Sequence, residues 1–241
     1  MKAIAAQARE KRFYEGAQLV ASNVGYARGL HKFEDVANKK IAIDALGSVS
    51  HYQLEQIARI KQVDPGRIEM KPLRTLNAIA RAVGTGEVDA AILPAPYARE
   101  LMAANQAKLV GWYSEIDEQQ MGALFVSTKM IGTRREVVEK FVRAYRRGVA
   151  DYAAALLRKD VHSKRTSDTK AHETATKIAR YVYPDHSDTG ASMVEAGAYF
   201  IEPQAQLDPA DIERQLTWYK GRGLVDKSVN VRDVVDPSFV K

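Results

Sequence analysis

Residues 39–52 read Lys39-Lys40-Ile41-Ala42-Ile43-Asp44-Ala45-Leu46-Gly47-Ser48-Val49-Ser50-His51-Tyr52, which is typical of a buried strand, a loop of small residues and a helix start. The first turn of a helix carries unpaired N–H groups and the positive end of the helix dipole, so a strand leading directly into a helix offers an anion site. Gly47 lets the backbone approach a ligand, and Ser48 and Ser50 can cap the helix or donate hydroxyl hydrogen bonds. The same residues also fit an ordinary helix cap that binds nothing.

The flanking sequence alternates predicted strands with predicted helices. Strands are expected at residues 39–46, 67–73, 89–93 and 108–113, and helices at residues 51–61, 75–83 and 101–104. This alternation predicts a mainly parallel sheet with helices on both faces. Ligands of such sheets bind at the carboxyl ends of the strands, where residues 47–51 and 94–97 both lie.

The rest of the chain shows a different pattern. Residues 3–12 look helical, residues 18–22 look like a strand, and residues 25–32 look like a loop. After a strand at 122–128, helices are expected at residues 133–157, 172–182, 190–200 and 209–222. The C-terminal half lacks the strands for a sheet of its own, so its helices must pack on another part of the protein.

Composition excludes several classes of function. The 241 residues are 46% hydrophobic and 27% charged, as in an ordinary globular protein. The chain has no cysteine, which rules out disulfides and cysteine nucleophiles. The net charge of +6 favours anionic ligands in a general way, but no DNA-binding motif accompanies it, so no nucleic-acid partner is expected. No metal or cofactor is expected, and the N-terminal residues are too polar for the apolar core of a signal peptide.

Several short motifs, taken in order, carry a family resemblance. The motifs are residues 35–43, Gly47-Ser48, His51, residues 73–86 leading into 88–91, Pro96-Tyr97, residues 122–128 with the helix after them, and residues 216–220, 223–225 and 235–239. Together they resemble the nitrate/sulfonate/taurine and thiamine-precursor (NMT1/THI5-like) family of ABC-transporter receptors. The resemblance implies the α/β type II periplasmic-binding-protein fold, with two lobes that each hold a mainly parallel sheet flanked by helices.

The resemblance also implies how the chain divides. Residues 1–36 would be a remnant of lobe one with the first hinge crossing, and residues 37–118 would form lobe two. Residues 119–241 would hold the second crossing and the C-terminal helical part of lobe one. Family members carry a further N-terminal segment, so lobe one is expected to be incomplete. Its unpaired strand edges would then favour association into a homo-oligomer.

The function that the resemblance implies is solute binding without catalysis. A periplasmic receptor would close two lobes around a small anionic or heteroaromatic solute (a sulfonate, nitrate, carboxylate or pyrimidine) and present it to a membrane permease. The expected ligand-binding residues are Gly47, Ser48, Val49, Ser50, His51, Pro96, Tyr97, Gln120 and Asn23.

Two alternatives remain open, an enzyme on the same fold and a ligand-sensing domain. The related thiamine-pyrimidine synthase and sulfinate-cleaving hydrolase depend on cysteines, which this chain lacks. A sensing domain of a transcription regulator would need a helix-turn-helix segment, and none precedes residue 39.

Overall fold

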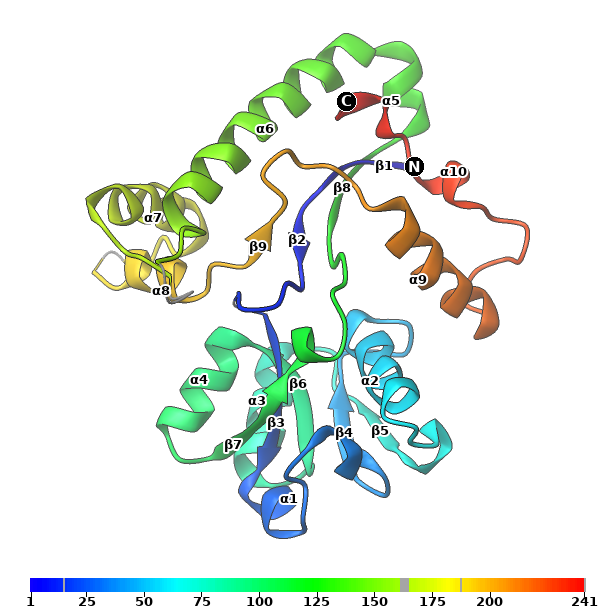
Figure 1. The fold of residues 1–241 in the computed structure, drawn as a ribbon, viewed down its shortest axis with the longest axis vertical. Coiled ribbons are helices and arrows are strands. Elements are labelled where there is room, and N and C mark those ends of the chain that lie inside the picture. Colours follow the sequence, from blue (N-terminus) through cyan, green and yellow to red (C-terminus); the bar gives the residue numbers. More distant parts are fainter. Residues whose placement is uncertain (15, 161–164, 187, 241) are drawn as a thin grey trace. The chain divides into compact units, whose positions relative to one another are not determined.

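The computed structural model describes residues 1–14, 16–160, 165–186 and 188–240. Its internal contacts divide the chain into two units (Figure 1). The first unit consists of Met1–Glu15 together with Gln119–Lys241, and the second unit is Gly16–Glu118. The structure therefore moves the expected boundary at residue 36 to Gly16, because residues 17–22 form a strand inside the sheet of the second unit.

The second unit contains a five-stranded sheet in the order β5-β4-β6-β3-β7. Its strands are β3 (Ala17–Ser22), β4 (Lys40–Ile43), β5 (Glu69–Pro72), β6 (Ala90–Pro94) and β7 (Ala107–Trp112). β4 is parallel to β5 and β6, whereas β3 is antiparallel to both β6 and β7. The mainly parallel sheet that the sequence predicted is confirmed, with one strand reversed.

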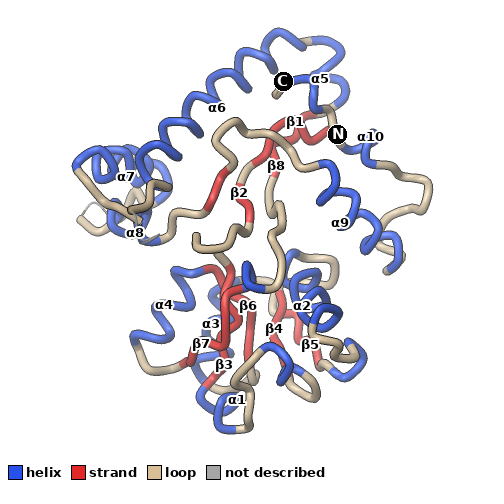
Figure 2. Tube along the Cα trace, viewed as in Figure 1, coloured by secondary structure: helices blue, strands red, loops and turns tan. Residues whose placement is uncertain are grey.

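Helices cover both faces of this sheet (Figure 2). α2 (Val49–Ile60) packs on one face, and α3 (Leu76–Thr85) and α4 (Ala95–Ala103) pack on the other. Along β4, Ile41 and Ile43 join the core beneath α2, while Ala42 joins the core beneath α3. A strand that is buried on both faces needs apolar residues at every position, which explains the continuous apolar run.

The remaining helical segments of the second unit are short. They are α1 (Asn23–Ala27) and the 3-10 turns η1 (Phe33–Val36), η2 (Pro65–Arg67) and η3 (Tyr113–Glu115). α1 falls partly in residues 25–32, which the sequence analysis expected to be a loop. The Ser22 hydroxyl accepts the Gly25 N–H at 2.9 Å, so a capped helical turn begins before the expected loop and runs into it.

The first unit contains two antiparallel ladders of two strands each. β1 (Lys2–Ala6) pairs with β8 (Ala123–Val126), and β2 (Ala8–Arg9) pairs with β9 (Phe200–Ile201). The helix expected at residues 3–12 is therefore wrong, because pairing with β8 outweighs the helix preference of this alanine-rich segment. The expectation of a mainly parallel sheet in each lobe also fails for the described part of this unit.

Helices make up most of the first unit. They are α5 (Thr128–Thr133), α6 (Arg135–Leu156), α7 (Thr169–Val182), α8 (Gly190–Ala196), α9 (Pro209–Gly221), α10 (Val231–Val234) and the 3-10 turn η4 (Pro237–Phe239). α6 packs Val138 and Val142 against Ile4 of β1 in one core, and α7 and α8 form a second core with the end of α6. Across the described residues, no helix has the length and apolar character needed to span a bilayer.

Candidate ligand-binding site

The turn between β4 and α2 lies at the carboxyl edge of the parallel strands of the second unit. Ser48 is the N-cap of α2, and its Oγ accepts the N–H of His51 at 3.3 Å. Gly47 has a φ of 80°, a left-handed conformation in which a side chain would be strained. The glycine thus lets the chain turn from strand to helix, as the sequence predicted for this loop.

The hydroxyl groups of this turn bond to one another and to Asp44. Ser50 Oγ donates to Asp44 Oδ2 at 2.8 Å and accepts the N–H of Asp44 at 3.0 Å. Since the Ser50 proton is used in this way, Ser48 Oγ donates across the 3.0 Å contact between the two hydroxyls. Both hydroxyl protons are used inside the turn, so Ser48 and Ser50 have no side-chain donor left for a ligand.

His51 stabilises the turn through its imidazole ring. Its Nδ1 accepts the N–H of Gly47 at 2.9 Å, which assigns the ring proton to Nε2, 3.2 Å from Glu55 Oε1. Both side chains are buried, with exposed fractions of 8% and 7%. His51 therefore holds Gly47 in place, and its imidazole lies within the protein interior.

Two backbone N–H groups stand open at the start of α2. Among the described residues, nothing accepts a hydrogen bond from the N–H of Val49 or of Ser50. Close to these donors are two exposed apolar side chains, Leu46 at 65% and Val49 at 38%. The edge therefore combines anion-binding donors with an apolar surface.

Arg74 lies beside this turn and was missed by the sequence analysis. Its N–H donates to the carbonyl of Asp44 at 2.9 Å, and its φ is 67°, unusual for a residue other than glycine. Within the described part of the chain, its guanidinium forms no hydrogen bond or ion pair, and the residue is exposed. The sequence did hold one indication of this residue: Arg74 lies in the connection between the predicted strand at 67–73 and the predicted helix at 75–83, at the carboxyl end of the strand.

Pro96 and Tyr97 lie in the first turn of α4, which starts at the end of β6. Tyr97 packs against the core beneath α3 and lines a groove of about 330 Å³ between α3 and α4, together with Arg81 and Glu100. The structure thus gives Tyr97 a packing role in this groove. Its expected contact with a solute stays a prediction.

Asn23 does not join the turn at Gly47. β3 runs antiparallel to β6, so its last residue, Ser22, lies at the amino edge of the parallel strands, opposite the β4–α2 turn. Asn23 follows there, and its Nδ2 donates to the carbonyl of Asn105 at 2.8 Å. Grouping Asn23 with residues 47–51 was therefore wrong, because the direction of β3 could not be read from the sequence.

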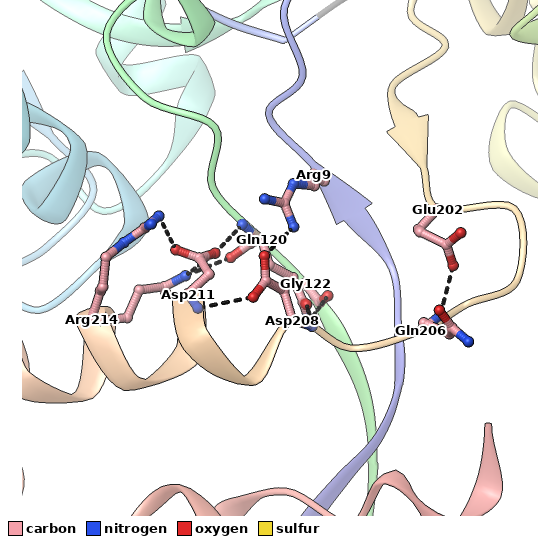
Figure 3. A network of polar contacts seen from close by, with 9 residues as sticks. Arg9, Gln120, Gly122, Glu202, Gln206, Asp208, Asp211 and Arg214 are labelled. Carbon is pink, nitrogen blue, oxygen red and sulfur yellow. Dashed lines mark hydrogen bonds and ion pairs between the residues drawn. The ribbon is translucent and has the colours of Figure 1, made fainter. Parts of the chain in front are cut away.

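Gln120 belongs to the first unit, where its amide is used in a polar network with α9 (Figure 3). Its Oε1 accepts the N–H of Asp208 at 2.9 Å, and its Nε2 donates to the carbonyl of Gly122 at 3.2 Å. The side chain thereby fastens the segment before β8 to the start of α9. This structural role differs from the ligand contact that the sequence analysis expected.

The carboxylate of Asp211 is the centre of this network. It is 1% exposed and accepts the N–H of Gln120 at 2.5 Å, Nη2 of Arg214 at 2.7 Å and Nε2 of Gln215 at 3.1 Å. A buried carboxylate needs such partners to offset the loss of hydration. Asp211 therefore ties the chain segment at Gln120 to α9.

Asp208 forms a second ion pair in the same place, with Arg9 at 2.8 Å. Burial acts to raise the pKa of Asp208, but the hydrogen bonds from Arg9 and from the Asp211 N–H outweigh burial and lower it below 3.8. The folded state therefore holds the charged form more strongly than the unfolded state does.

This lowered pKa predicts an acid-dependent loss of stability. The contribution of Asp208 is complete above pH 4 and disappears as the pH falls through the folded pKa; because the pair is partly exposed, we expect at most about 1 kcal/mol. Urea unfolding between pH 2.5 and 6 should show a shallower decline for Asp208→Asn than for the parent. Asp185→Asn, at an exposed position, is the matched control and should follow the parent curve. Equal slopes for Asp208→Asn and the parent would contradict the assignment.

The sequence was compared with models of protein families and with curated proteins. A family model described as NMT1/THI5 like matches residues 18–155, which is more than half of the chain. Among curated proteins, none matches the sequence significantly.

Several solved structures share the fold at low sequence identity. The periplasmic aliphatic sulphonate binding protein SsuA from Escherichia coli is 15% identical with a TM-score of 0.69, over 98% of this chain and 70% of that protein. The ligand binding component of an ABC-type import system from Staphylococcus aureus is 13% identical with a TM-score of 0.67, over 99% and 72%. The desulfurization enzyme DSZB is 14% identical with a TM-score of 0.56, over 99% and 77%.

These likenesses establish the α/β fold of the periplasmic binding proteins, which the motif order had predicted. They do not transfer a ligand, because the identities are low and the shared fold also carries an enzyme. The family follows from the sequence match over residues 18–155: this chain belongs to the NMT1/THI5-like family.

Proposed function

We propose that this chain is a solute-binding protein of an ABC import system and that it takes a small organic anion. The observation that carries the proposal is the edge of the second unit, where, among the described residues, the N–H groups of Val49 and Ser50 have no acceptor and the guanidinium of Arg74 has no partner; the backbone of Arg74 bonds to Asp44 in the same turn. A helix N-terminus and a nearby arginine are the groups that proteins use for sulfonates, phosphates and carboxylates. The structural neighbours that belong to ABC import systems support this role.

The apolar side chains at this edge narrow the class of anion. Leu46 and Val49 are both exposed next to the open donors. An anion with an alkyl or aryl group would bury these side chains while its charged head meets the N–H groups, at about 25 cal/mol per Å² of apolar area removed from water. We therefore expect an alkyl or aryl sulfonate or carboxylate to bind more tightly than nitrate.

The partner and the compartment follow from the same proposal. A solute-binding protein of an importer hands its ligand to a membrane permease, and the sulphonate-binding neighbour is periplasmic. We therefore propose that this chain is periplasmic and that its partner is a membrane permease. The enzyme alternative gains no support from a cysteine nucleophile, because the chain contains no cysteine.

Isothermal titration calorimetry of the purified chain tests the proposal. The panel consists of nitrate, taurine, alkane- and arenesulfonates, aromatic carboxylates and aminopyrimidines. If Arg74 meets the anionic group, Arg74→Gln should weaken binding of the best sulfonate or carboxylate by about 10- to 100-fold, since a charged hydrogen bond contributes ~1.5–3 kcal/mol.

Arg180→Gln is the matched control, because Arg180 is an exposed arginine on α7 of the first unit. It removes the same charge and should leave the affinity within about twofold. Equal losses for the two variants would point to a general effect of net charge and would contradict a site at Arg74. Absence of binding for the whole panel would contradict the proposed function itself.

A further inference from the structure

Two neighbouring turns of the second unit each carry one charged side chain. The turn at residues 44–48 leads from β4 into α2, and the turn at residues 73–75 leads from β5, the neighbour of β4 in the sheet, into α3. The charged residues of these turns are Asp44 and Arg74. The N–H of Arg74 donates to the carbonyl of Asp44 at 2.9 Å, so the two backbones are fixed side by side.

The carboxylate of Asp44 is held at the start of α2. Its Oδ2 accepts the hydroxyl of Ser50 at 2.8 Å, and the oxygen of that hydroxyl accepts the N–H of Asp44 at 3.0 Å. Within the described part of the chain, no donor bonds to Oδ1, and the side chain is only partly buried. The N–H of Ser50 is one of the two open donors of α2. An acceptor with a negative charge therefore lies beside these donors.

Asp44 and Arg74 do not form an ion pair with each other. Although their backbones are bonded, the guanidinium of Arg74 and the carboxylate of Asp44 are farther apart than ion-pair distance. Neither side chain pairs with any other charged group among the residues that the structure describes. The edge therefore offers a ligand one cationic and one anionic side chain, in addition to the N–H groups of α2.

We propose that Asp44 determines the specificity of this edge and that the solute is a zwitterion. The ammonium group of the solute donates to Oδ1 of Asp44, while its sulfonate or carboxylate group accepts from Arg74 and from the open N–H groups of α2. This inference rests on the function proposed above, and it narrows the class of organic anion to those that also carry an amino group.

The chemistry of the two kinds of ligand explains this preference. A carboxylate only accepts hydrogen bonds and an ammonium group only donates them, so the two are complementary, and hydrogen bonds between charged groups are the stronger kind. A plain anion would leave Oδ1 of Asp44 without a donor and would place a like charge beside it. An unpaired charge of this kind disfavours the wrong ligand and thereby raises specificity.

The acidic group and the ammonium group of the solute lie close together. Ser50 supplies both the open N–H that meets the acidic group and the hydroxyl that holds the carboxylate of Asp44. Both binding groups therefore surround one residue, which suits a short carbon chain between the two ends of the solute. Leu46 and Val49 are exposed at the same edge and can contact the methylene groups of that chain.

Isothermal titration calorimetry with pairs of solutes of equal length tests this inference. The pairs are 2-aminoethanesulfonate with ethanesulfonate, and 3-aminopropanoate with propanoate. In each pair the parent chain should bind the amino compound at least about tenfold more tightly, the gain expected from one charged hydrogen bond. Asp44→Asn keeps an oxygen that can accept the Ser50 hydroxyl but removes the charge, so it should bring the two affinities of a pair to within about threefold.

Asp64→Asn is the matched control, because it removes the same charge from an exposed position after α2, where asparagine can still cap the turn at Gly66. This variant should keep the preference of the parent. A parent that binds the plain anion as tightly as the amino compound would overturn the inference and leave the proposed function standing. An unchanged preference in Asp44→Asn would also overturn it. Binding of none of these solutes would overturn the inference, and the wider panel above decides the proposed function separately.

Discussion

Asp211→Ala should lower the free energy of unfolding of the first unit by about 3–5 kcal/mol, the usual cost of breaking a buried charged network on one side. The substitution leaves the N–H of Gln120 and the side chains of Arg214 and Gln215 without their shared acceptor. Figure 3 shows Arg214 of α9 and Gln120 of the segment before β8 converging on this carboxylate. Urea unfolding followed by circular dichroism would measure the loss.

Two variants make this prediction specific. Asp211→Asn keeps an acceptor oxygen of the same shape and should cost less than Asp211→Ala. Asp185→Ala removes a carboxylate from an exposed position on the loop after α7 and should change stability by no more than about 0.5 kcal/mol. If Asp211→Ala is as stable as Asp185→Ala, the network does not hold α9 in place.

Gly25→Ala should destabilise the second unit by about 3 kcal/mol, at the upper end for overpacking. A Cβ at Gly25 would lie 2.1 Å from the carbonyl oxygen of Asp89 and 2.7 Å from its carbon. That backbone is fixed, since the same oxygen accepts the N–H of Ser22 at 2.9 Å. The melting temperature should fall by about 6–12 °C for a protein of this size.

Gly132→Ala is the matched control for this change. Gly132 lies in α5 of the first unit, and a Cβ there meets nothing within 4 Å. Alanine favours helix over glycine, so this variant should be as stable as the parent or slightly more stable. A Gly25→Ala protein with the melting temperature of Gly132→Ala would show that α1 does not pack against Asp89 as described.

Local patterns in the sequence were sufficient for three elements of the second unit. β4, α2 and α3 appear where alternation and helical spacing predicted them, because each is decided by nearby residues. The reversal of β3 was not predictable, since a strand carries no local mark of its direction. The segment at residues 3–12 was misjudged for a related reason: its partner strand β8 lies more than a hundred residues away.

The candidate site was predicted in outline and corrected in detail. The loop at Gly47 and the cap at Ser48 follow from residue types, whereas the hydrogen bonds of Ser50 and His51 depend on where Asp44 and Glu55 lie. Arg74 follows β5 in the chain, and it lies at the site because β5 is the neighbour of β4 in the sheet. Asp211 meets Gln120 across 91 residues, a contact that no spacing in the sequence indicates.

The most direct test of the proposed binding site is a titration of the ¹⁵N-labelled chain with hexanesulfonate and benzenesulfonate, followed by amide NMR. The account predicts that the largest shifts are those of the N–H groups of Gly47, Val49, Ser50 and Arg74, with saturation at increasing sulfonate. Saturable shifts confined to other residues, such as those lining the groove at Tyr97, or no saturable shift at all, would contradict it.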